Sequence, residues 1–210
     1  MFRQYFPLVL VTAALAVTSY LWFVPQTVNK PQNNINTANL KTATFAGGCF
    51  WCTETDFEKL TGVAEATSGY MGGSAETATY KQTSAGNTGH REVVQVTYDS
   101  TLLSYKDLVD YHWRHFDPTD NEGQFADRGF VYSPAVFYSD ESEQAAAIQS
   151  LKELNALKVF PVTIEVPIVA ASTFYKAEEY HQDYYLKHPT PYKTYRRLSG
   201  RDAFLNKYWK

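Results

Sequence analysis

Two cysteines lie three residues apart in a stretch whose composition suits thiol chemistry. Cys49 and Cys52 follow a Gly-Gly pair, with a strand-like segment (residues 41–46) before them and a helix-forming run to residue 60 after them. Cys49 is therefore expected near a helix N-terminus, where free N–H groups and the helix dipole favour a thiolate. One helical turn separates the two Cβ atoms by about 5–6 Å, which is within reach of a disulfide. The spacing predicts an attacking and a resolving thiol. The alternative is a pair of buried cysteines or an inert disulfide.

Two large apolar side chains, Phe50 and Trp51, stand between the cysteines. Thioredoxin-type motifs have the same spacing but commonly carry small residues or proline at these positions. The two rings are either core residues or the floor of a pocket for an apolar group such as a methyl. In the second case they would hold that group beside the thiol.

A second candidate is Glu92, at the start of the strand-like segment 92–98. Taken alone, a glutamate at a strand start is most often solvated. If Glu92 faces a pocket lined by Phe50 and Trp51, loss of hydration raises its pKa and makes it a general acid. Three further polar side chains adjoin predicted loops: Tyr80, Tyr132 and Asp127.

Composition narrows the class of protein. The chain has 210 residues, of which 44% are hydrophobic, and a net charge of -3. Its lysines and arginines are scattered, which argues against a nucleic-acid-binding protein. Two cysteines are too few for the usual structural zinc site. The aromatic content of 16%, with sixteen tyrosines, supplies hydroxyl donors on apolar walls, although it also fits a tyrosine-rich core and surface.

The N-terminal region predicts a membrane anchor. Residues 5–24 carry no charge, and twenty helical residues rise about 30 Å, the thickness of a bilayer core. We expect an uncleaved transmembrane helix (1–24), a flexible polar linker (25–42) and an exported catalytic domain (43–210). The alternative is a signal peptide whose cleavage releases a secreted protein, because residues 14–16 resemble a small-x-small cleavage site.

Beyond the linker, strands and helices interleave. Strands are predicted at 63–70, 92–98, 134–138 and 162–169, and helices at 104–116, 140–156 and 177–187. Some strands follow one another directly in sequence. The pattern predicts an α+β fold of two layers, with a ferredoxin-like core and additions.

Several motifs in a fixed order resemble one family. They are Gly-Cys-Phe-Trp at 48–51, Gly-Tyr-Met-Gly-Gly at 69–73, Gly-Asn-Thr-Gly-His-Arg-Glu at 86–92, Gly-Gln-Phe-Ala-Asp-Arg-Gly at 123–129 and Ala-Glu-Glu-Tyr-His-Gln at 177–182. Together they are similar to the A-type peptide methionine sulfoxide reductases. The resemblance runs from about residue 44 to the C-terminus and covers neither the anchor nor the linker.

The resemblance implies a role for each candidate. Cys49 would attack the sulfoxide sulfur and Glu92 would protonate its oxygen. The remaining positions match the family's oxygen-binding tyrosines (Tyr80 and Tyr132), its methyl-binding wall (Phe50 and Trp51) and a pocket aspartate (Asp127). It implies activity as a peptide-methionine (S)-S-oxide reductase on oxidised proteins, peptides or free methionine S-sulfoxide. No metal or flavin cofactor is expected, and the reductant would be a thioredoxin-like protein or another thiol.

The sequence departs from many relatives at Cys52, where they carry glycine and use cysteines near the C-terminus instead. The tail of this chain contains no cysteine. Either Cys52 or an external thiol must therefore resolve the sulfenic acid on Cys49. A general dithiol–disulfide oxidoreductase, and a tethered module that binds exposed methionines, are the competing interpretations. Thiol exchange does not require the acid Glu92.

Overall fold

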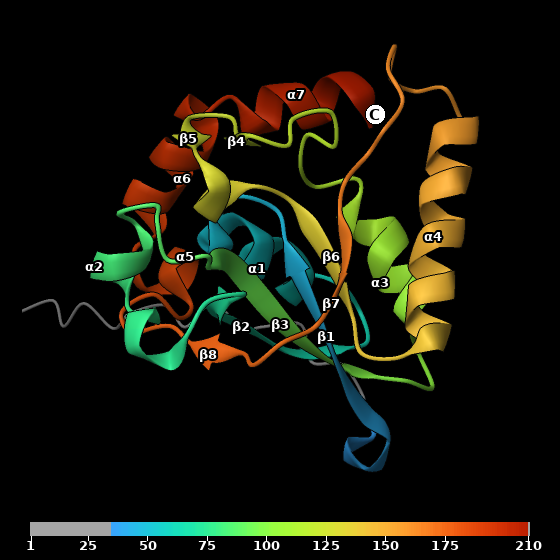
Figure 1. Ribbon diagram of the computed structural model, residues 1–210, viewed down its shortest axis with the longest axis horizontal. Helices are drawn as coiled ribbons and strands as arrows, with labels where there is room; N and C mark the ends of the chain where they lie inside the picture. Colours follow the sequence, from blue (N-terminus) through green and yellow to red (C-terminus); the bar gives the residue numbers. More distant parts are fainter. Residues whose placement is uncertain (1–34, 210) are drawn as a thin grey trace, which may run out of the picture.

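The computed structural model describes residues 35–209. Within them, a six-stranded mixed sheet forms the centre (Figure 1). In spatial order its strands are β7 (Ile168–Ala170), β6 (Ala135–Tyr138), β1 (Leu40–Ala46), β3 (Arg91–Asp99), β2 (Val63–Met71) and β8 (Tyr175–Lys176). A separate hairpin joins β4 (Gly123–Gln124) to β5 (Asp127–Arg128).

Helices surround this sheet. The α-helices are α1 (Phe50–Glu58), α2 (Tyr80–Thr83), α3 (Tyr105–His112), α4 (Glu141–Ala156), α5 (Tyr184–Lys187), α6 (Pro189–Leu198) and α7 (Arg201–Tyr208). Short 3-10 turns are η1 (Thr37–Asn39), η2 (Ala75–Thr77) and η3 (Phe130–Tyr132). Figure 1 shows α6 and α7 in red beside the β4–β5 hairpin.

The four central strands follow the order β6-β1-β3-β2, and every neighbouring pair among them is antiparallel. Along the chain they form the succession β1-α1-β2-β3-α3-β6. This is the split β-α-β arrangement of a ferredoxin-like core. The edge strand β7 adds to β6 in parallel, and β8 adds to β2. The predicted mixed α and β core is confirmed.

The main core lies between the sheet and the helices. Strand β3 is rich in valine, which suits a pleated, buried surface, and Val94 and Val96 are fully buried. Phe45 of β1 stacks on Phe57 of α1 with ring centroids 4.9 Å apart. Leu108 of α3 is also fully buried in this cluster. The packing holds the start of α1 against the ends of β1 and β3.

The turn between β1 and α1 requires its two glycines. Gly48 has φ +87, a left-handed conformation, and a Cβ there would lie 2.5 Å from the Gln124 side chain. At Gly47 a Cβ would lie 2.8 Å from Cε1 of His112. Any side chain at either position would strain the backbone or clash. The close approach places Cys49 directly after the end of the central strand β1.

Two predicted elements are shorter than expected. The predicted strand 162–169 is regular only as β7, and the proline at 167 lacks the N–H that a strand interior needs. The predicted helix 177–187 is wrong apart from α5. Asp183 has φ 53, and the Gln182 side chain bonds both backbone groups of Ser68, at 2.9 and 3.0 Å. That side chain pairs with the sheet where a helix was expected.

The expected membrane helix and most of the linker lie outside the described residues. From residue 35 to residue 209 the chain contains no helix long and apolar enough to span a bilayer. Strand β1 begins at Leu40, three residues before the expected start of the catalytic domain. It pairs with β3 from its first residue onward.

Candidate active site

Cys49 occupies the N-cap position of α1. Its carbonyl oxygen accepts the N–H of Cys52 at 3.1 Å, which begins the helix. Both cysteines are free thiols. The strand, the Gly-Gly turn and the helix therefore place the sulfur of Cys49 where the sequence predicted it.

A cavity of about 190 Å³ lies over this sulfur. Its lining consists of Cys49, Phe50, Trp51, Tyr80, Glu92, Asp127, Tyr132 and Tyr195. The structure thus brings together every predicted site residue except Cys52, which lies behind the cavity. It also adds one residue, Tyr195, that the sequence analysis did not identify.

Glu92 is the acid of this cavity and is bound to the helix that carries the thiol. Its Oε2 accepts the backbone N–H of Phe50 at 2.9 Å, which satisfies one of the free donors at the start of α1. The side chain is 3% exposed. Burial raises the pKa of Glu92 to about 8, with added repulsion from Asp127 and Cys52. Glu92 therefore carries a proton at neutral pH and can donate it into the cavity.

The surroundings of Cys49 oppose the thiolate that the helix N-terminus favours. Burial raises the pKa of the Cys49 thiol well above its ordinary value, and its contact with Cys52 and the charge of Glu92 raise it further. The helix N-terminus does not outweigh these effects, because the cavity contains acids and no cation. Cys49 is a protonated thiol before substrate binds.

Two phenols face the same cavity from separate elements. Tyr80 is the first residue of α2, and its backbone N–H is held by the Glu178 carboxylate at 2.9 Å. Tyr132 is the last residue of η3. Burial raises the pKa of both phenols. Each therefore keeps its proton and can donate a hydrogen bond to an oxygen atom.

The aromatic wall is fixed by a buried histidine. Trp51 Nε1 donates to His181 Nδ1 at 3.2 Å, and the indole stacks on Tyr184 with centroids 3.7 Å apart. The His181 ring also lies 4.8 Å from Phe50 and 4.6 Å from Tyr80. Burial lowers the pKa of His181, which keeps it a neutral acceptor. One imidazole thus positions three residues of the cavity.

Tyr195 of α6 joins the thiol to the pocket aspartate. Its hydroxyl donates a short hydrogen bond to Asp127 Oδ2 and is also within hydrogen-bond reach of Cys49. Burial raises the pKa of Asp127 and of Tyr195. The residue lies outside the motifs that carry the family resemblance, in a chain with sixteen tyrosines. Nothing in the sequence distinguished it.

Cys52 has different surroundings. It is 1% exposed, lies one helical turn after Cys49 and is hydrogen-bonded to it. This contact lowers the pKa of Cys52 to about 7, assisted by Arg201 and Arg196 and opposed by burial. Of the two thiols, Cys52 is the one that ionises near neutral pH.

The chemistry of this site is carried by side chains. In residues 35–209 no cluster of histidine, cysteine or carboxylate side chains could hold a metal ion.

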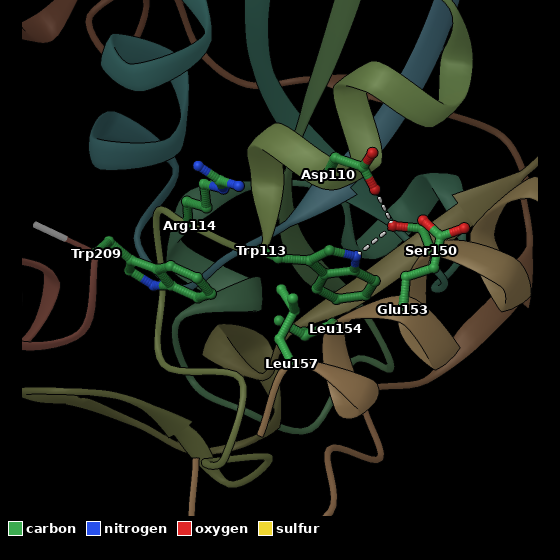
Figure 2. A pocket seen from close by; sticks show the side chains of 8 residues that line it. All are labelled: Asp110, Trp113, Arg114, Ser150, Glu153, Leu154, Leu157 and Trp209. Carbon is green, nitrogen blue, oxygen red and sulfur yellow. Dashed lines mark hydrogen bonds between the residues drawn. The ribbon is translucent and has the colours of Figure 1, made fainter. Parts of the chain in front are cut away.

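A second cavity of about 230 Å³ lies between α3, α4 and Trp209 (Figure 2). There Ser150 accepts the Trp113 indole N–H at 2.8 Å and donates to Asp110. This cavity contains no thiol, so it is not the reactive centre. A thiol and a protonated carboxyl that line one cavity fit the class of thiol-dependent reductases.

A family model described as peptide methionine sulfoxide reductase matches residues 41–210. The MsrA/MsrB protein of Vibrio cholerae is 43% identical over 197 residues, which are 94% of this chain and 51% of that protein. This chain therefore spans about half the length of that relative. The MsrA protein of Bacillus licheniformis is 46% identical over 167 residues, covering 80% of this chain and 92% of its own.

Solved structures agree with this result. Reduced Mxr1 from Saccharomyces cerevisiae has a TM-score of 0.68 at 28% identity, covering 76% of this chain and 92% of its own. Methionine sulfoxide reductase A of Corynebacterium diphtheriae has a TM-score of 0.61 at 28% identity, covering 72% of this chain and 76% of its own. The chain belongs to the peptide methionine sulfoxide reductases of the A type, enzymes that reduce methionine sulfoxide to methionine.

Proposed function

We propose that this chain reduces the S epimer of methionine sulfoxide, free or within oxidised proteins and peptides, through attack by Cys49. One observation carries the proposal: the protonated carboxyl of Glu92 and the thiol of Cys49 line the same cavity, and a hydrogen bond to Phe50 fixes Glu92 to the start of α1. Sulfoxide reduction requires a nucleophile for sulfur and a proton for oxygen at the same place.

In the first step, the Cys49 sulfur attacks the sulfoxide sulfur while Glu92 gives its proton to the oxygen. The S–O bond breaks, and the released hydroxide bonds to the Cys49 sulfur as the bond between the two sulfurs breaks. Methionine leaves with that electron pair, and Cys49 becomes a sulfenic acid. The proton of the Cys49 thiol replaces the one that Glu92 donated, so charge and atoms balance. General acid catalysis of this kind typically contributes a factor of about 10² to 10⁴.

The other residues of the cavity bind different groups of the substrate. The hydroxyls of Tyr80 and Tyr132 supply donors for the sulfoxide oxygen, whose negative charge grows until it is protonated. Phe50 and Trp51 supply an apolar wall for the S-methyl group. Because methyl and oxygen have separate sites on one cavity, only one epimer presents its sulfur to Cys49.

Cys52 then resolves the intermediate. Its thiolate attacks the Cys49 sulfenic sulfur, a proton is taken up, and water leaves as the Cys49–Cys52 disulfide forms. The spacing of one helical turn is short enough for this bond with little backbone movement. Cys52 also has the lower pKa of the pair. A thioredoxin-like protein or another thiol then returns both cysteines to the reduced state, without a bound cofactor.

Turnover of resolved epimers tests the proposal. The full chain with dithiothreitol is expected to convert methionine S-sulfoxide to methionine and to leave the R epimer unchanged, as followed by chromatography of the products. Equal conversion of both epimers would contradict the two-site cavity. Absence of any methionine would contradict the assignment of Cys49 and Glu92.

We propose further that residues 5–24 anchor the enzyme in a membrane, with the catalytic domain exported. The support is the uncharged stretch itself and Arg3 on its short N-terminal side. Fractionation followed by N-terminal sequencing tests this. An intact N-terminus in the membrane fraction is expected, whereas a processed soluble protein would indicate a cleaved signal peptide.

A further inference from the structure

The two sulfurs differ in how they can be reached. Cys49 is 6% exposed and lines the substrate cavity. Cys52 is 1% exposed and does not line it. A polar cavity of about 510 Å³ on the other side is lined by Asp56, Arg196 and Asp202 among others, again without Cys52. A thiol that approaches the oxidised pair therefore meets Cys49 first.

A buried arginine and a partly buried one lie on the side of Cys52. Arg201 of α7 is 2% exposed, and its Nη2 donates to the carbonyl of Gly47 at 2.8 Å. Arg196 of α6 pairs with Asp56 at 3.0 Å and with Asp202 at 2.8 Å. Asp56 lies one helical turn after Cys52 on α1. The two arginines thus contact the chain just before α1 and the helix itself.

Neither arginine lines the substrate cavity, and both act on Cys52, although Arg201 also acts on Asp127 of the cavity lining. Arg201 and Arg196 both favour the Cys52 thiolate, and Asp56 disfavours it. The charged and titratable groups that face Cys52 are Arg196, Arg201, Asp56, Cys49, Glu92, Tyr192 and Tyr195. The arginines are the cations among them.

We propose that Arg196 and Arg201 are positioning residues that make Cys52 the leaving sulfur when an external thiol enters through the substrate cavity and attacks Cys49. The proposal rests on the proposed function in one respect, namely that Cys49 and Cys52 form a disulfide. It assigns the route of the reductant, its point of attack and the two side chains that assist the bond cleavage.

The exchange balances without a further reactant. The sulfur of the entering thiolate bonds to Cys49, the Cys49–Cys52 bond breaks, and the electron pair leaves on Cys52. A second thiol then attacks the mixed disulfide and frees Cys49. Because a leaving thiol of lower pKa departs faster, cations beside Cys52 speed the first of these steps.

The sulfur that is attacked can be identified directly. The full chain is oxidised to the disulfide with diamide, so that the result does not depend on sulfoxide reduction. Limiting 2-mercaptoethanol is then added, the mixture is quenched with acid, and free thiols are capped with N-ethylmaleimide. Fragment mass spectrometry is expected to find mercaptoethanol on Cys49 and maleimide on Cys52. Mercaptoethanol on Cys52 would overturn the proposal.

Two variants that break the same ion pair distinguish an effect of charge on the rate from an effect of the lost contact. Arg196→Gln and Asp56→Asn each break the Arg196–Asp56 contact, but they change the charge beside Cys52 in opposite directions. Reduction of the disulfide by 2-mercaptoethanol is expected to slow about three- to tenfold in Arg196→Gln and to speed up about twofold in Asp56→Asn. Arg196→Lys is expected to restore most of the rate.

Equal slowing in both variants would show a structural role and overturn the proposal. The yield of methionine in the first turnover, which precedes the exchange, serves as the reference for each protein. If Arg196→Gln does not fold, Asp56→Asn and Arg196→Lys still decide the matter. A rate in Asp56→Asn no higher than in the unmodified chain contradicts the proposal.

Discussion

The two sides of the Cys-Phe-Trp-Cys segment differ in charge and access, although one helical turn separates them. On the side of Cys49 a cavity contains a protonated acid and phenols, and its lining has no cation. On the side of Cys52, the buried Arg201 and the partly buried Arg196 act on a sulfur that is 1% exposed. Cys49 is held as a thiol, whereas Cys52 ionises near pH 7.

The difference shows how one short motif can serve two steps. The cavity side must protonate an oxygen, which a cation would hinder by ionising Glu92. The arginine side must stabilise a sulfur anion, which acids would hinder. The two cysteines lie one helical turn apart, and only Cys49 lines the cavity, so each sulfur has its own environment. The following variants test that separation, from the largest expected effect on activity to the smallest.

The cysteines themselves give the largest contrast. Cys49→Ser removes the nucleophile and is expected to abolish methionine formation. Cys52→Ser is expected to form about one methionine per enzyme and then to recycle more slowly, because only an external thiol can reach the sulfenic acid. Rapid-quench measurement of the first turnover distinguishes them. Unchanged steady-state turnover of Cys52→Ser with a thioredoxin-type reductant would show that Cys52 is not the resolving cysteine.

Glu92→Gln tests the proton source. The amide cannot protonate the sulfoxide oxygen, so the first turnover is expected to slow about 10²-fold or more. In the unmodified chain the pKa of Glu92 is raised to about 8, so its acid form is present below that pH and is lost above it. The fall in rate through pH 8 is expected to disappear in the variant. A variant that keeps this fall would exclude Glu92 as its cause.

Tyr195→Phe tests the link between the thiol and Asp127. The change removes the hydroxyl that donates to Asp127 and lies within hydrogen-bond reach of Cys49, so Asp127 loses this partner and the pKa of Cys49 rises further. We expect first-turnover chemistry to slow about tenfold, in line with one lost hydrogen bond to a charged group. Tyr184→Phe is the matched control, because it removes a hydroxyl but keeps the ring stacked on Trp51. An equal loss in both variants would contradict the specific role of Tyr195.

Ser150→Ala tests the second cavity, where the smallest effect on activity is expected. The change leaves the Trp113 indole N–H without its acceptor (Figure 2), which costs about 1–3 kcal/mol of stability. The urea midpoint is expected to fall while the rate of the first turnover stays unchanged. Slower sulfoxide reduction in a fully folded variant would connect this cavity to the active site.

The sequence predicted the parts of the site that depend on local spacing. Cys49 at a helix start after a Gly-Gly turn, and the central strands of the sheet, follow from residue types and periodicity. Tyr195 could not be predicted, because α6 reaches the cavity only through tertiary packing. The ionisation of Cys49 was predicted from the helix N-terminus alone. Burial beside Cys52 and Glu92 opposes it, and Glu92 is held there by a hydrogen bond from Phe50, 42 positions away in the chain.

Because Cys52 is buried, the proposed exchange brings the reducing thiol to the disulfide through the substrate cavity over Cys49. Oxidised methionine and the electron-supplying thiol must then take turns at the same opening over Cys49. The two compounds compete for the cavity. A high concentration of either one therefore slows the half-reaction that needs the other. The turnover rate is therefore highest when methionine sulfoxide and reducing thiol are both supplied and neither is in large excess.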